Sequence, residues 1–164
     1  MAEQCESTRF LKGVLIMRGI GLFPLLLLFG CAVPYSIEAP EQFKRYTTKT
    51  EFKWITADGV MLGAREVENY PEAPLTFWSD AARQHLEKTG YLHEKTTCFK
   101  TKDGLDGCTL KFALPHGAED WVYQETIFVV DDAIVLLEAG GEYSRFNAIE
   151  DDLAKALKSF RPHQ

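Results

Sequence analysis

Four histidines are the side chains best suited to acid–base chemistry, and their spacing gives none of them a partner. His85, His93, His116 and His163 lie far apart, and no pair has the HExxH spacing of a zinc site. Glu94 follows His93 directly, so a small ligand carrier or hydrolase-like enzyme could use scattered groups such as His93, Glu94 and His116. Because no motif brings these residues together, we expect neither catalytic residues nor a metal site.

Paired carboxylates are a second source of acid–base chemistry. Glu66 and Glu68 lie two residues apart, so on a strand they share one face while Arg65 and Val67 share the other. A solvated strand face is the simpler interpretation of this pattern. No serine lies in a GxSxG elbow. The sequence therefore predicts no enzymatic activity and no cofactor.

Trp121 and Tyr123 are candidates for a partner surface. They lie two residues apart at the start of a predicted strand and therefore share a face. Aromatic side chains are enriched at protein interfaces. A half-buried sheet face is the alternative for the same pattern.

The most specific motif is a cysteine at the end of a short apolar run. Residues 19–30 carry no charge, and Arg18 precedes them. The run is shorter than the roughly 20 residues of a membrane-spanning helix and has the form of a secretory signal. Its end, Leu28-Phe29-Gly30-Cys31, resembles the lipobox of bacterial lipoproteins, although that family usually has a smaller residue at the position of Phe29.

This resemblance implies that the Cys31 thiol receives a diacylglycerol and that Cys31 becomes the first residue of the mature chain. Residues 1–30 would then be a signal peptide, and Met17 its start, because Glu3 and Glu6 are atypical of a basic leader. Ala32 stands where aspartate would retain such a lipoprotein in the inner membrane. The resemblance therefore implies an envelope protein anchored by lipid, in the outer membrane and facing the periplasm. An uncleaved anchor with Cys31 as an ordinary thiol is the alternative.

Two further cysteines fit an exported domain. Cys98 and Cys108 flank Lys102-Asp103-Gly104, a turn signal, so two strands folding back at Asp103 would place the cysteines opposite each other. Facing side chains on paired strands are close enough for a disulfide. The alternatives are a metal pair and a reversible redox pair.

The remaining chain predicts a flexible tether over residues 31–50 and one domain over residues 51–162. Two prolines and no sustained periodicity indicate the tether. Turn signals and apolar periodicity predict the order strand, strand, helix, four strands, helix. The expected strands cover 51–57, 60–68, 91–101, 105–115, 120–130 and 133–139, and the expected helices cover 74–89 and 146–160.

Hairpins build an antiparallel sheet, and continuously apolar strands such as residues 127–130 require cover on both faces. We therefore expect an α+β fold with the sheet sandwiched by helices. The opening hairpin at Asp58-Gly59, the two helices and the 107–112 strand resemble the PsbP-like fold. That resemblance implies a non-enzymatic binding or assembly module whose partner is an unknown envelope protein or small ligand. The net charge of −6 argues against nucleic acid.

Overall fold

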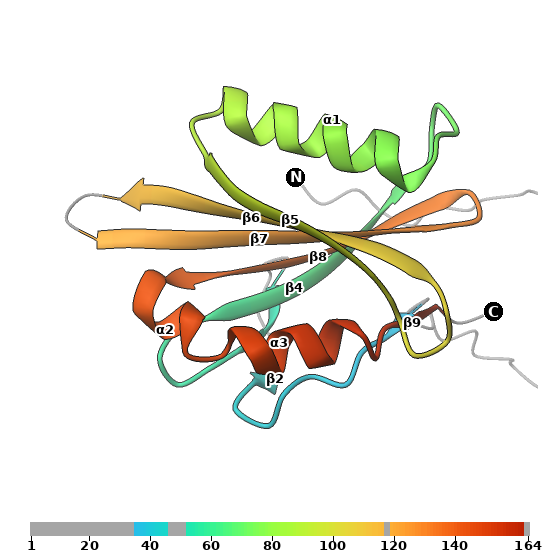
Figure 1. Cartoon of the computed structure of the whole chain (residues 1–164). Helices are drawn as coiled ribbons and strands as arrows, with labels where there is room; N and C mark the ends of the chain where they lie inside the picture. Colours follow the sequence, from blue (N-terminus) through green and yellow to red (C-terminus); the bar gives the residue numbers. More distant parts are fainter. Residues whose placement is uncertain (1–34, 46–51, 117–118, 163–164) are drawn as a thin grey trace, which may run out of the picture. The chain divides into compact units, whose positions relative to one another are not determined.

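A seven-stranded antiparallel sheet forms the centre of the domain, in the order β2-β3-β4-β8-β7-β6-β5 (Figure 1). The computed structural model describes residues 35–45, 52–116 and 119–162. The signal-like segment and Cys31 lie outside the described residues, as do residues 46–50 of the predicted tether. The strands are β2 (Lys44–Arg45), β3 (Phe52–Ile55), β4 (Met61–Glu68), β5 (Leu92–Lys100), β6 (Asp106–His116), β7 (Glu119–Val130) and β8 (Ala133–Glu142).

Local turns place the hairpins where the sequence predicts them. Gly59 and Gly104 both have a positive φ, which glycine adopts without a steric penalty. Asp131 adopts a left-handed φ of 51° in the turn between β7 and β8. Strands β7 and β8 pair along the whole length of β8 and lie in the middle of the sheet.

Helices cover both faces of the sheet, so the predicted α+β sandwich is confirmed. Helix α1 (Leu75–Lys88) lies on one face, and α2 (Tyr143–Asn147) and α3 (Glu150–Leu157) lie on the other (Figure 1). In the described part of the chain, no helix combines the length and apolar character needed to cross a membrane.

The last predicted helix is divided in two. The Glu142 carboxylate accepts hydrogen bonds from the backbone N–H groups of Ser144 and Arg145 and so starts α2 early. Asn147 and Glu150 have the three-residue spacing of a capping box, but both accept hydrogen bonds from Lys111 Nζ instead. An ammonium from the sheet therefore replaces the local contact that the pattern predicts.

Each face of the sheet has its own apolar cluster. On the α1 face, the buried side chains are Leu110, Phe112, Ile127, Ile134 and Leu136. On the α3 face, Phe128 stacks on Phe160 with ring centroids 4.1 Å apart. Neighbouring residues on β7 thus enter opposite clusters, which explains why the central strands are continuously apolar.

Residues 35–45 belong to the domain, so the prediction of a flexible tether over this segment is wrong. Strand β1 (Tyr35–Ser36) pairs with β9 (Arg161–Pro162), and β2 extends the edge of the main sheet. Phe43 is buried in the α3-face cluster. Two-residue strands and two buried aromatic rings, those of Tyr35 and Phe43, leave no periodic signal, so the sequence pattern could not reveal this packing.

Candidate functional site

A groove runs beside α1, because this helix covers only part of the sheet face on which it packs. Helix α1 packs mainly on β5, β6 and β7. Along its other side lies a groove of about 270 Å³ over β7, β8 and β4. Its lining residues are Val67, Glu68, Trp78, Ala81, Ala82, His85, Glu125, Ile127, Ile134 and Leu136. The short side chains of Ala81 and Ala82 keep the helix wall of the groove open.

One wall of the groove is fixed by hydrogen bonds to the loop before α1. Trp78 Nε1 donates to Asn69 Oδ1 over 2.7 Å, and the same oxygen accepts from the backbone N–H of Ala73 over 3.1 Å. Asn69 is itself buried. The indole therefore occupies a defined position, and the groove is largely preformed.

Buried and half-buried polar side chains meet beside Glu125 on this face of the sheet. Arg65 on β4 forms an ion pair with Glu138 on β8, with Nε and Oε2 3.2 Å apart. The hydroxyl of Tyr123 on β7 lies 2.7 Å from Glu138 Oε1 and 3.1 Å from Glu125 Oε2. Glu125 and Glu138 are register partners on neighbouring strands, and both are buried. Like charges directly opposite each other destabilise a sheet, so this pair needs a compensating group.

The hydrogen atoms available for hydrogen bonds between Tyr123, Glu125 and Glu138 indicate how the charges of the two glutamates are balanced. Tyr123 has one hydroxyl hydrogen, yet two carboxyl groups lie within hydrogen-bond distance of its oxygen. Glu138 already pairs with Arg65 and takes the shorter contact. A proton on Glu125 completes the chain, because the Glu125 hydroxyl can then donate to the Tyr123 oxygen while Tyr123 donates to Glu138.

The electrostatic environment agrees with this assignment. Burial raises the pKa of Glu125, and the charge of Glu138 raises it further, against the opposing effects of the Tyr123 hydrogen bond and the Arg65 charge. Burial also raises the pKa of Tyr123, so the phenol stays neutral. The groove thus has apolar walls and one buried carboxyl group whose pKa its surroundings raise.

The scattered histidine and glutamate groups do not converge. His93 forms a 2.8 Å hydrogen bond to Thr96 and packs on Phe112 on the α1 face of the sheet. Glu94 lies 4.0 Å from Lys111, which binds Glu150 near the N-terminus of α3 on the opposite face. The His116 side chain lies outside the described residues. The structure therefore does not bring His93 and Glu94 into one site.

The two aromatic residues proposed as a partner surface are both half-buried. The Tyr123 ring lies 5.4 Å from Tyr91 on the α1 face, and its hydroxyl belongs to the polar cluster. Tyr123 therefore has an internal role that the sequence alone does not reveal. The use of Trp121 as a partner surface stays a prediction.

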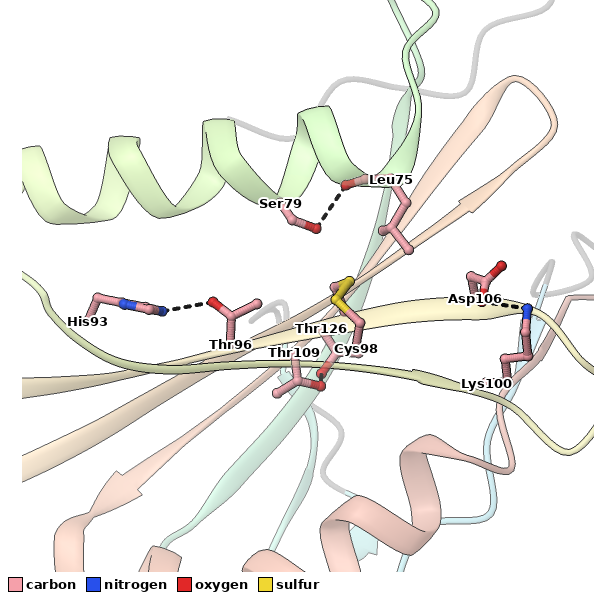
Figure 2. The surroundings of a disulfide bond; sticks show 10 residues. Leu75, Ser79, His93, Thr96, Cys98, Lys100, Asp106, Thr109 and Thr126 are labelled. Atoms are coloured by element: carbon pink, nitrogen blue, oxygen red, sulfur yellow. Dashed lines mark hydrogen bonds and ion pairs between the residues drawn. A yellow bond between two sulfur atoms is a disulfide. The ribbon is translucent and has the colours of Figure 1, made fainter.

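Cys98 and Cys108 form the expected disulfide. They are register partners on β5 and β6, separated by 10 residues in sequence. Figure 2 shows the bridge on the same side of the sheet as Leu75 and Ser79, at the start of α1. Cys98 is exposed, whereas Cys108 is buried. The bond thus ties the edge strand of the sheet to its neighbour at the solvent boundary.

Sequence reasoning missed Glu125 and Glu138, although a signal for them exists. Glu138 directly follows an apolar stretch that predicts a central strand covered on both faces, and Glu125 lies two residues before another. A carboxylate at such a position must find a partner or a proton.

Across the ranges that the structure describes, no group of three or more His, Cys, Asp or Glu side chains could hold a metal ion.

Comparison with known proteins shows which solved structures share this fold. No protein-family model and no curated protein matches the sequence. Among solved structures, the chain is similar to cyanobacterial PsbP (CyanoP) from Synechocystis, with a TM-score of 0.58 and 11% identity, over 85% of this chain and 99% of that one. It is also similar to LpqN of Mycobacterium tuberculosis, described as involved in cell envelope biogenesis, with a TM-score of 0.62 and 9% identity, over 79% and 83% of the two chains.

A third similar structure comes from a different cellular setting. The Ran-binding protein Mog1p of Saccharomyces cerevisiae matches with a TM-score of 0.52 and 10% identity, over 79% of this chain and 90% of that one. The predicted PsbP-like α+β fold is therefore confirmed. Because this fold serves proteins described so differently, the function must be argued from the site.

Proposed function

We infer that this chain is a lipid-anchored protein of the bacterial cell envelope whose PsbP-like domain is a non-enzymatic ligand-binding module. The lipobox-like segment ending at Cys31 supports the anchor. The partly exposed Cys98–Cys108 bridge supports an oxidising compartment, because glutathione and thioredoxin keep cytosolic thiols reduced. The described role of the similar LpqN structure in envelope biogenesis agrees with this location.

The observation that carries the binding function is the groove beside α1. Ligand sites are typically concave and mostly apolar, with a few convergent polar groups. This groove has such walls, a volume of about 270 Å³ and one buried carboxyl group at its base. The domain is therefore suited to hold a small, largely apolar ligand while attached to a membrane.

The anchor is tested by intact mass spectrometry of the full protein, extracted from the outer-membrane fraction without reductant. We expect a chain that starts at a lipidated Cys31 and weighs two hydrogens less than its reduced form. The Cys31→Ser variant, which lacks the acceptor thiol, should carry no lipid. An unlipidated wild-type mass that keeps residues before Cys31 would refute the anchor.

The groove is tested by fluorine NMR with a small aromatic probe, such as fluorobenzene. We expect line broadening by the wild-type protein and its loss in Ala82→Phe, which fills the groove from the helix wall. Ala154→Phe, on the exposed side of α3, is a matched control that should bind normally. Equal broadening by all three proteins would show that the probe binds elsewhere.

A further inference from the structure

We propose that the groove beside α1 takes a small apolar primary amine, whose ammonium group replaces the proton on Glu125. This inference rests on the proposed binding function and names its ligand class. It starts from the charge balance of the polar cluster. Glu125 and Glu138 face each other on adjacent strands, and Arg65 is paired with Glu138. A proton balances the second carboxylate in the empty groove, and a ligand cation would balance it in the occupied one.

The lining residues favour a cation over an anion. Two of them, Glu68 and Glu125, are carboxylates, and none is lysine or arginine. His85 on α1 is the one basic side chain in the lining, and it is exposed on the helix side. The charged and titratable groups that act on Glu125 are Arg65 from β4, Tyr123 from its own strand, Glu138 from β8 and His85 from α1. An anionic ligand would find no lysine or arginine in the lining to pair with, whereas an ammonium can pair with a Glu125 carboxylate.

The apolar walls define the remainder of the ligand. Trp78, Ile127 and Leu136 offer aromatic and branched surfaces that form no hydrogen bond with a ligand tail. Benzene fits a cavity of about 150 Å³ in another protein, so a groove of about 270 Å³ has room for one ring and a short aminoalkyl arm. A primary ammonium has three donors and little bulk, which suits a carboxyl group recessed among strands.

The exchange is balanced in protons and charge. Before binding, Glu125 is a neutral acid, and the amine is an ammonium in solution near neutral pH. After binding, a Glu125 carboxylate accepts a hydrogen bond from the ammonium, and the proton formerly on Glu125 passes to solvent. Tyr123 continues to donate to Glu138. Binding of one amine should therefore release up to one proton, whereas a neutral ligand of the same shape should release none.

The experiment is isothermal titration calorimetry of the full chain in phosphatidylcholine nanodiscs, with empty nanodiscs as the blank. Benzylamine and its neutral isostere benzyl alcohol are titrated at about pH 7 in phosphate and in MOPS, whose ionisation enthalpies differ. We expect benzylamine to bind at least about tenfold more tightly than benzyl alcohol. The buffer dependence should correspond to the release of nearly one proton per site.

Variants assign this effect to Glu125. Glu125→Gln keeps the shape and should lose both the proton release and the preference for the amine. Glu66→Gln removes a carboxylate from the same strand as Glu68, two residues away and outside the groove lining, and should behave as wild type. If Glu125→Gln does not fold, the wild-type protein still tests the exchange, because benzylamine affinity should then rise with pH.

The outcomes separate this inference from the function on which it rests. Equal affinities for the two probes, or amine binding without proton release, would overturn the amine inference while leaving an apolar binding groove. Binding of neither probe by protein with a native circular dichroism spectrum would overturn the groove as a ligand site.

Discussion

Glu125 shows how a single buried side chain responds to a neighbour of like charge. Its pKa is higher in the folded than in the unfolded chain, first because of burial and then because of Glu138. Between those two pKa values, the folded state binds more protons than the unfolded state, so stability falls as the pH rises. Glu125→Gln removes this titration. We therefore expect the variant to gain stability relative to wild type as the pH is raised from about 4 to about 8.

Urea unfolding followed by tryptophan fluorescence across this pH range measures the difference. The stability gap between Glu125→Gln and wild type should change steadily with pH, whereas the gap for Glu66→Gln, at an exposed carboxylate on β4, should stay nearly constant. Parallel pH profiles for wild type and Glu125→Gln would mean that Glu125 is ionised in the fold.

Gly107 shows a different constraint at the same scale. A Cβ atom at this position would overlap the ring of Phe128, which is fully buried and stacked on Phe160. The ring cannot move aside without disturbing the stack, so Gly107→Ala should destabilise the domain by about 1–3 kcal/mol. Urea unfolding measures this loss. In a Phe128→Leu background the same substitution should cost much less, and an unchanged cost would exclude the overlap as its cause.

At the scale of elements, local signals predicted hairpins well and long-range packing poorly. The turns at Asp58-Gly59 and Asp103-Gly104 are encoded by adjacent residues, so their hairpins and the pairing of Cys98 with Cys108 follow from the sequence. The Glu142 carboxylate starts α2 by accepting hydrogen bonds from the backbone N–H groups of Ser144 and Arg145. Lys111, distant in sequence, donates to Asn147. The site was missed for the same reason, because its carboxyl groups come from different strands.

The disulfide gives a prediction at this scale. It joins β5, the outermost strand beyond β6, to the rest of the sheet through a short loop. Chain-entropy arguments assign about 2–3 kcal/mol to closing a loop of this length. The double variant Cys98→Ala, Cys108→Ala should lose this amount in urea unfolding, and amide hydrogen exchange should increase most in β5.

The matched control for this prediction is reductant. Dithiothreitol should lower the stability of wild type towards that of the double variant and leave the variant unchanged. A double variant as stable as oxidised wild type, with unaltered exchange in β5, would show that the hydrogen bonds between β5 and β6 hold the edge strand without the bridge.

At the scale of the whole molecule, the packing of residues 35–45 changes how an anchored domain relates to its membrane. With a lipid on Cys31, a tether through residue 50 would let the domain move tens of ångströms from the bilayer. Tyr35, the first of the described residues, is buried and pairs with Pro162. The four residues from Cys31 to Tyr35 span at most about 14 Å, so a lipid on Cys31 would hold Tyr35 close to the membrane surface.

Neutron reflectometry of the full, lipidated chain on a supported phosphatidylcholine bilayer measures this distance. We expect the protein layer to begin within about 14 Å of the headgroups. A 15-residue Gly/Ser insertion after Ala32 should widen and blur that gap, since a flexible linker of this length has a mean span of about 20 Å. A wild-type gap larger than the chain can reach would mean that the anchor or the packing of residues 35–45 is wrong. A short gap would confine ligand capture to the membrane surface, where a small apolar amine is concentrated by partitioning into the headgroup layer.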